Sequence, residues 1–212
     1  MKRISPHICV FIIIALIALT GLNSQFHSKL TELRYSLLPE QATGNVVLVA
    51  IDSKSLQETE TWPWPRSLHA EIIKKLEIAG ASDIAFDIDF SSKSTEEQDA
   101  IFLQALKQAK GSIILPSFKQ IQKHFNKAPT IVHTEPLPDF KKNSWLANVN
   151  LSPSRNGLVE KIPYGYKMNG EFIPSLASLL SGKLNLKTDG FYVDYSIKAN
   201  TVPVVSYVDV IH

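Results

Sequence analysis

Residues 45–52 read NVVLVAID, residues 83–88 read DIAFDI and residues 112–116 read SIILP. Each is a short run of β-branched and other apolar side chains, which is typical of a buried strand in a parallel sheet. Between these runs, residues 66–79 carry apolar side chains at helical spacing, and residues 95–109 form a second predicted helix. Strand, helix, strand, helix, strand in this order predicts a right-handed parallel α/β unit.

The two predicted helices have recognisable ends. The first places His69, Ile72 and Ile73 on one face and ends at Gly80. Thr95 is the predicted N-cap of the second helix, whose first turns carry acidic side chains that the helix dipole favours. The fold class that follows is α/β, a three-layer-like domain with a mostly parallel sheet.

Strand and helix patterns alternate less regularly in the second half of the chain. Residues 119–143 are polar and contain three prolines, so we expect an insertion over the edge of the sheet. Strand-like or short helical patterns resume at residues 145–151, 158–168, 174–181 and 190–196. Another element starts at residue 203 and continues to residue 211, so the sheet is expected to be incomplete at the C-terminus.

An apolar segment precedes the α/β pattern. From Ile4 to Phe26 there is no Lys, Arg, Asp or Glu, and a membrane-spanning helix needs about 20 such residues. A cleaved signal peptide is the alternative, with Ala18 and Thr20 as the best pair of small residues for a peptidase. Both interpretations send the rest of the chain across the membrane, because the positive flank before the segment stays in the cytoplasm.

These patterns divide the chain into three parts. We expect an N-terminal transmembrane helix with a cytoplasmic stub over residues 1–28, and a juxtamembrane helix and linker over residues 29–44. Residues 45–212 form the extracytoplasmic domain. The juxtamembrane helix runs from residue 25 to residue 38, since Pro39 stops it.

Composition narrows the class of protein. The chain has 212 residues, 44% of them hydrophobic, and a formal net charge of +2. This apolar share excludes a disordered chain. The near-neutral net charge shows no excess of basic residues of the kind that binds nucleic acid. Cys9 is the single cysteine, which excludes an internal disulfide and a cysteine-rich zinc site.

The densest motif is Trp-Pro-Trp-Pro-Arg at residues 62–66, between the first strand and the first helix. The prolines restrict the backbone, so Trp62 and Trp64 are presented at low entropic cost. One interpretation is an aromatic wall for a ligand, with Arg66 available for an anion or a cation–π contact. The other is a rigid cap over the end of the sheet, with Arg66 paired to a nearby carboxylate.

Three carboxylates form a second group of candidate site residues. Asp52 and Asp87 end strands that should be parallel neighbours, and Asp89 follows closely. Ligands of open α/β sheets bind at that edge, where carboxylates hold Mg²⁺ or Ca²⁺ or act as acid and base. Alternatively, an Asp there caps loop amides and pairs with Arg66. His69, on the apolar face of its helix, is most simply a core residue.

No phosphate-binding loop, nucleophile elbow or zinc-protease motif occurs. We therefore predict no catalytic residue, no metal and no cofactor. The candidate residues for ligand binding or for the structure of the sheet edge are Asp52, Trp62, Trp64, Arg66, His69, Asp87 and Asp89.

From about residue 46 to residue 212 the chain resembles the second type of CHASE domain, a sensory module of cyclases and histidine kinases. The resemblance rests on Ile51-Asp52, the Trp62–Arg66 block with His69-Ala70, Ala79-Gly80-Ala81, Phe86-Asp87-Ile88 with Phe90, Asp99, Leu115-Pro116, Asn148-Val149-Asn150 and Ile173-Pro174-Ser175-Leu176-Ala177. It implies an extracytoplasmic input domain whose family continues with further spanning helices and a cytoplasmic output domain.

The sequence therefore predicts a sensor of a ligand or other stimulus, without catalytic activity, in a bacterial transmembrane receptor with a cyclase or histidine kinase output. It would sit in the inner membrane with its bulk in the periplasm. Its expected partners are the lipid bilayer and an unidentified small molecule or protein, a homodimer is left open, and nucleic acid is not expected. The alternative is a membrane-anchored exported metal-dependent enzyme that uses Asp52, Asp87 and Asp89.

Overall fold

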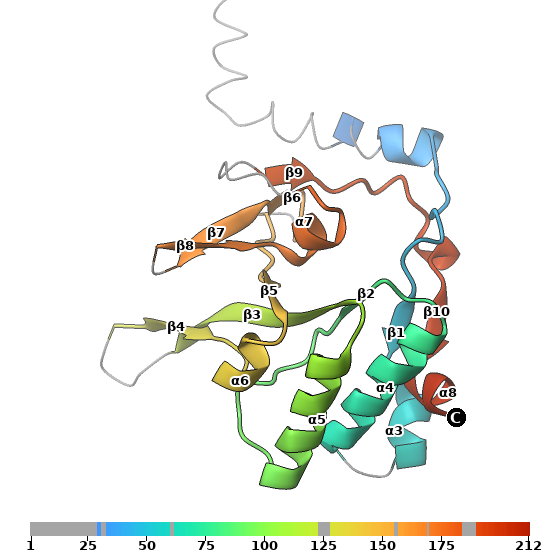
Figure 1. Ribbon diagram of the computed structural model, residues 1–212. Helices are drawn as coiled ribbons and strands as arrows, with labels where there is room; N and C mark the ends of the chain where they lie inside the picture. The colour runs from blue at the N-terminus through green and yellow to red at the C-terminus, as the bar shows by residue number, and fades with distance from the viewer. Residues whose placement is uncertain are drawn as a thin grey trace, which may run out of the picture. The chain divides into compact units, whose positions relative to one another are not determined.

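The computed structural model describes residues 29–30, 33–59, 62–122, 128–154, 157–168, 170–183 and 190–212 (Figure 1). The predicted membrane anchor at residues 1–28 lies outside these ranges. Among the described helices, none combines the length and the apolar character needed to cross a bilayer.

The described elements alternate between short strands and helices. In chain order they are β1 (Leu48–Ala50), α3 (Ser53–Thr59), α4 (Arg66–Ile78), β2 (Asp83–Ala85), α5 (Glu96–Gln108), β3 (Ser112–Gln122), β4 (Thr130–Thr134), α6 (Pro138–Lys141), β5 (Trp145–Asn148), β6 (Lys161–Pro163), β7 (Gly165–Met168), β8 (Glu171–Pro174), α7 (Leu176–Leu180), β9 (Gly190–Tyr192), a 3₁₀ turn (Ala199–Thr201), β10 (Val204–Ser206) and α8 (Tyr207–Ile211).

The chain divides into two compact units. One comprises residues 1–48 and 194–203, and the other comprises residues 49–193 and 204–212. We call them the small unit and the large unit. In the small unit, residues 33–37 are helical and the helix ends before Pro39, as predicted for its described part. Glu40 then pairs with Ile197 through a parallel bridge.

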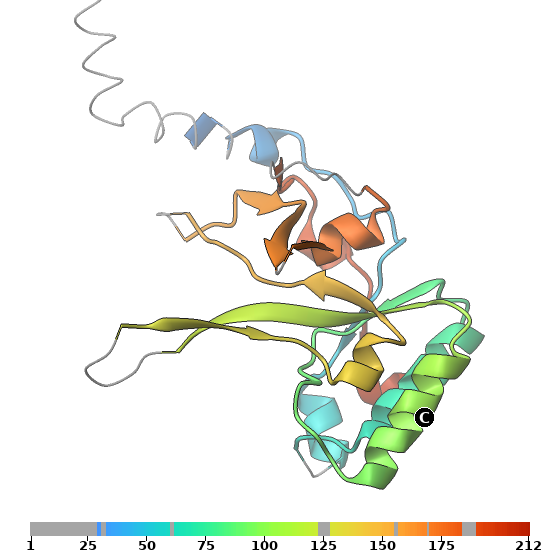
Figure 2. The same cartoon turned by 60° about the vertical axis from the view of Figure 1, so that its left-hand side comes forward.

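The large unit contains the predicted α/β pattern. β3 pairs in parallel with both β2 and β5, with Ile84 opposite Ile113 and Leu115 opposite Leu146. In both views α4 and α5 lie on one side of β3, while β7, β8 and α7 lie on the other (Figures 1 and 2). The mixed α/β class is confirmed, although the remaining registered ladders, β3–β4, β6–β9 and β7–β8, are antiparallel.

Both long helices begin and end close to the predicted residues. Thr95 caps α5, because its side chain accepts a hydrogen bond from the backbone N–H of Gln98 at 3.2 Å. α4 ends at Ile78, and Gly80 follows with a φ of +94°, a conformation that favours glycine.

The core of the large unit lies between these helices and the central sheet. Aromatic and β-branched side chains dominate it, which is typical of a fully buried parallel sheet. Its buried members are Trp64, Ile72, Ile73, Ile84, Phe86, Phe90, Phe102, Leu106, Ile113, Leu115, Phe140, Tyr207 and Ile211.

Two sequence-based expectations about the sheet were wrong. β1 does not join β2 but pairs with β10, so the first predicted strand lies outside the central sheet. Residues 119–143 are not a simple insertion: β3 continues to Gln122 and turns back as β4, and α6 buries Phe140 in the core. A two-stranded ribbon exposed on both faces has polar side chains at most positions, so its sequence resembles a loop.

Candidate functional site

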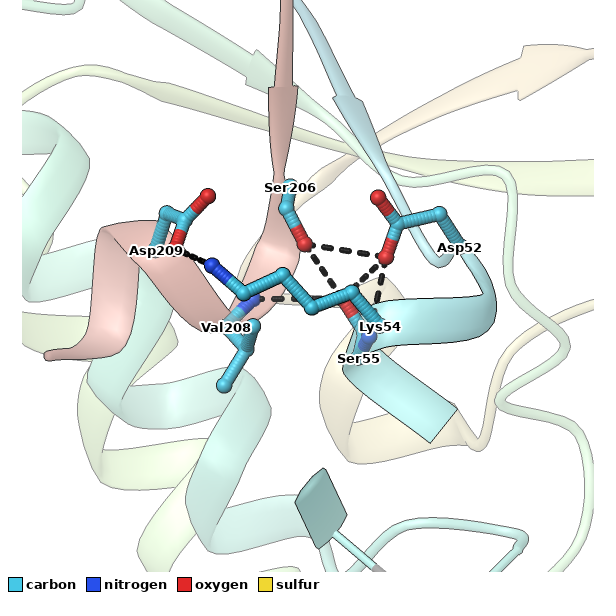
Figure 3. Close-up of polar contacts among 6 residues, drawn as sticks. All are labelled: Asp52, Lys54, Ser55, Ser206, Val208 and Asp209. Atoms are coloured by element: carbon cyan, nitrogen blue, oxygen red, sulfur yellow. Dashed lines mark hydrogen bonds and ion pairs between the residues drawn. The ribbon is translucent and has the colours of Figure 1, made fainter. Parts of the chain in front are cut away.

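Asp52 is the centre of a hydrogen-bond network immediately after β1. Its Oδ1 atom accepts hydrogen bonds from the backbone N–H and the hydroxyl of Ser55, each at 2.9 Å. The hydroxyl of Ser206, the last residue of β10, donates to the same oxygen at 2.9 Å. Figure 3 shows these groups meeting at one carboxylate oxygen, although 154 positions separate Asp52 from Ser206.

The same network reaches α8. The backbone N–H of Val208 donates to the hydroxyl oxygen of the fully buried Ser55 at 3.3 Å. On the solvent side, Lys54 forms an ion pair with Asp209 (Figure 3). Both of these charged side chains are about half exposed, so the pair is screened by solvent and contributes little to stability. The hydrogen bonds of Asp52 and Ser55 therefore attach this segment more firmly than the ion pair does.

Hydrogen bonding keeps the Asp52 carboxylate charged. The backbone N–H of Ser55, then its hydroxyl and that of Ser206, hold the pKa of Asp52 below its usual value. The pKa of Lys54 is raised, first by its contact with Asp209. At neutral pH the network is thus an ionised acceptor surrounded by neutral donors.

Trp64, His69 and Tyr207 lie together on the inner side of α4. The Trp64 ring lies 4.7 Å from that of Tyr207 and 6.3 Å from that of His69, centroid to centroid. Nδ1 of His69 is hydrogen-bonded to the phenolic oxygen of Tyr207 at 2.8 Å. Because Tyr207 follows Ser206, this cluster and the Asp52 network meet at the junction of β10 and α8. The indole N–H of Trp64 is buried and has no hydrogen-bond acceptor among the described residues.

His69 is a core residue, as its position on the helix predicted. Phe86, Phe90 and Phe102 present edges or faces to its ring at centroid distances of 6.1, 5.5 and 6.5 Å. Burial, and then the positive charge of Arg66, lower the pKa of His69 to about 4. The imidazole is therefore neutral under ordinary conditions.

Arg66 is buried and paired, but its partner differs from the predicted one. Its Nε atom lies 2.7 Å from Oδ1 of Asp99 in α5, and its guanidinium also reaches the carbonyl of Ser92. The contact with Asp99 is a close ion pair without an aligned hydrogen bond from Nε. The guanidinium carbon lies 5.2 Å from the ring of Phe90 and 5.1 Å from that of Phe140. Arg66 thus joins α4 to α5 and α6 inside the core.

The other predicted residues face solvent. The Trp62 side chain is 59% exposed, whereas that of Trp64 is 5% exposed, so the two indoles do not share one role. Asp87 and Asp89 are exposed, and Asp89 accepts a hydrogen bond from the backbone N–H of Ser91 at 2.8 Å.

The structure does not bring the three aspartates together at the end of one sheet. β1 pairs with β10 and β2 with β3, so Asp52 and Asp87 do not end neighbouring strands. Within the described ranges, which include all three aspartates, no group of three or more His, Cys, Asp or Glu side chains is placed to hold a metal ion. The expectation that strand adjacency would bring them together was wrong, so the strand order gives no support to the alternative of a metal-dependent enzyme.

Sequence analysis missed four residues of these clusters: Ser55, Asp99, Ser206 and Tyr207. Ser55 had a local signal, because an Asp three residues before a helical amide is a common N-cap spacing. The other three are distant in sequence from their partners, and neither periodicity nor spacing relates them.

The family model for the CHASE2 domain matches residues 8–212. The chain belongs to the CHASE2 family. CHASE2 domains are extracellular sensory domains of signalling receptors, which assigns the chain to signal transduction and to an extracytoplasmic location. No curated protein and no solved structure matches the chain.

Proposed function

We propose that this CHASE2 chain is the periplasmic input domain of a bacterial inner-membrane receptor, attached by a single spanning helix within residues 1–28. The observation that carries the proposal is the CHASE2 match over residues 8–212. The uncharged segment from Ile4 to Phe26, preceded by Lys2 and Arg3, supports the anchor and its orientation. The receptor's cyclase or histidine kinase output would be encoded beyond these residues.

We further propose that the stimulus, a small molecule or a protein, contacts the exposed members of the predicted set. Trp62 offers a large exposed aromatic face beside a fixed neighbour, since its ring lies 5.5 Å from that of Trp64. Asp87 and Asp89 offer exposed carboxylates on the loop after β2. A stimulus there would act by favouring one of two arrangements of the domain.

A topology experiment tests the proposal. Alkaline phosphatase, which is active only outside the cytoplasm, is fused after His212, and a cytoplasm-dependent reporter is fused at the same position in a second strain. We expect only the phosphatase to be active. The matched control replaces the positive flank with Lys2→Glu and Arg3→Glu, which should lower phosphatase activity because it removes the charges that orient the helix. Activity of only the cytoplasmic reporter after His212 would contradict the proposal.

A further inference from the structure

The chain passes between its two units at three places, after residues 48, 193 and 203. β1 spans the first passage, and β10 begins directly after the third. These strands pair with each other, and the backbone N–H of Leu48 donates to the carbonyl of Pro203 at 2.9 Å. The places where the chain crosses between the units after residues 48 and 203 therefore lie side by side.

The two strands differ in apolar burial, because Val49 of β1 packs against the core whereas Val204 and Val205 of β10 are exposed. Each strand has three residues, and a two-stranded sheet of that size is marginally stable by itself. The side chains of Leu48 and Val204 are 56% and 58% exposed. Burial of apolar area is the usual source of sheet stability, so β10 needs another attachment.

Asp52 supplies that attachment on the large-unit side. It lies two residues beyond β1 and binds the hydroxyl of Ser206 at the end of β10. Ser55 continues the contact, since its hydroxyl oxygen accepts the N–H of Val208. We call the three side chains Asp52, Ser55 and Ser206 the clasp.

α8 has a separate, apolar attachment. Tyr207, Val208 and Ile211 are buried, and the Tyr207 ring packs on Trp64 while its oxygen is hydrogen-bonded to His69. The clasp is held by hydrogen bonds alone, whereas this anchor is held mainly by apolar packing, with a hydrogen bond between Tyr207 and His69. Loss of the clasp therefore need not release α8 from the core.

We propose that the clasp is a conformational lock that holds together β1 and β10, the strands at two of the places where the chain crosses between the units. When the clasp is lost, these two strands open together. α8 and the rest of the large unit stay folded when it opens. Because the hydrogen bonds keep Asp52 ionised, displacement of a partner opens the lock and protonation near neutral pH does not. Its use in signalling rests on the proposed function, whereas the lock itself does not.

Hydrogen exchange on the purified full chain in detergent, without any stimulus, tests the lock. The variants are Asp52→Asn and Ser206→Ala, and the matched control is Asp89→Asn, another aspartate that accepts a backbone N–H two or three residues later. We expect exchange at residues 48–50 and 204–206 to become roughly tenfold faster in both variants, with α5 and the α8 amides after Val208 unchanged. A purely local capping role would change only the α3 amides and would leave the amide of Leu48 slow.

A cross-link supplies the converse test. In a Cys9→Ser background, Lys54→Cys and Asp209→Cys place two thiols at the ion pair that joins α3 to α8, and a short bismaleimide links them. Linking should restore slow exchange at residues 48–50 in Asp52→Asn. Unchanged exchange in both clasp variants, an equal change in Asp89→Asn, simultaneous opening of α5, or fast exchange despite the cross-link would each overturn the proposal. None of these results depends on membrane topology, so the lock and the proposed function fail separately.

Discussion

Two tryptophans of one short motif differ in exposure by more than tenfold, so substitution at each should have a different cost. Trp64 packs on Tyr207 and His69 inside the core, whereas Trp62 is mostly exposed. We expect Trp64→Ala to lower the free energy of unfolding by roughly 3–5 kcal/mol and Trp62→Ala by about 1 kcal/mol or less. Thermal or urea unfolding of the full chain measures both. Equal costs would contradict the division into a structural and an exposed indole.

Arg66 and Asp99 form a buried ion pair, in which each charge is stabilised by the other. Asp99→Asn leaves the guanidinium buried without a counter-charge, and breaking such pairs costs roughly 3–5 kcal/mol. Adding Arg66→Met removes the stranded charge and should recover part of that loss. The unfolding free energies of the wild type, Asp99→Asn, Arg66→Met and the double variant form a double-mutant cycle. A double variant less stable than Asp99→Asn would show that Arg66 acts mainly through packing on Phe90 and Phe140.

His69 should make stability depend on pH below neutrality. Its pKa is about 4 in the folded protein against a usual 6.5, so between these values the unfolded chain binds a proton that the native state excludes. Stability from this group is complete above about pH 6.5 and falls with pH, by up to roughly 3 kcal/mol near pH 4. His69→Gln should flatten the slope in that window, which pH-dependent urea unfolding of the two proteins measures. An unchanged slope in His69→Gln would contradict this assignment.

At the scale of elements, local patterns predicted helices better than strand partners. The apolar face of α4, the stop at Gly80 and the cap at Thr95 all depend on residues within a few positions, and the structure confirms them. Whether β1 pairs with β2 or with β10 depends on contacts across the chain. The three donors at Asp52 include Ser206, 154 positions away, and no pattern around β1 indicates that residue.

The α5 cap allows a prediction at the same scale. Thr95→Ala removes the acceptor for the N–H of Gln98 and should lower the free energy of unfolding by about 1 kcal/mol. Thr95→Ser keeps an oxygen at that position and should stay close to wild type, which makes it the matched control. Chemical unfolding of the three proteins measures the difference. Equal losses in both variants would indicate that the methyl group of Thr95, and not its oxygen, stabilises α5.

At the scale of the whole molecule, family membership was predictable and the arrangement of the candidate site was only partly so. The Trp-Pro-Trp-Pro-Arg block and the Phe-Asp-Ile motif indicated CHASE2, and the match over residues 8–212 confirms it. The same motifs did not reveal that Arg66 would pair with Asp99 or that Asp52 would bind Ser206. A motif specifies which residues stand at neighbouring positions of the sequence, whereas long-range partners depend on how the elements pack.

The N-terminal segment leads to the last prediction, that the anchor stays attached to the mature protein. Ala18 and Thr20 form a poor pair for signal peptidase, which favours small residues at both positions. The intact mass of the protein purified from membranes should therefore include residues 1–20. Thr20→Ala is the matched control, because it improves the pair and should yield a fraction shortened by about 20 residues. A wild-type mass lacking those residues would mean that the segment is a cleaved signal peptide and that the CHASE2 domain is released into the periplasm.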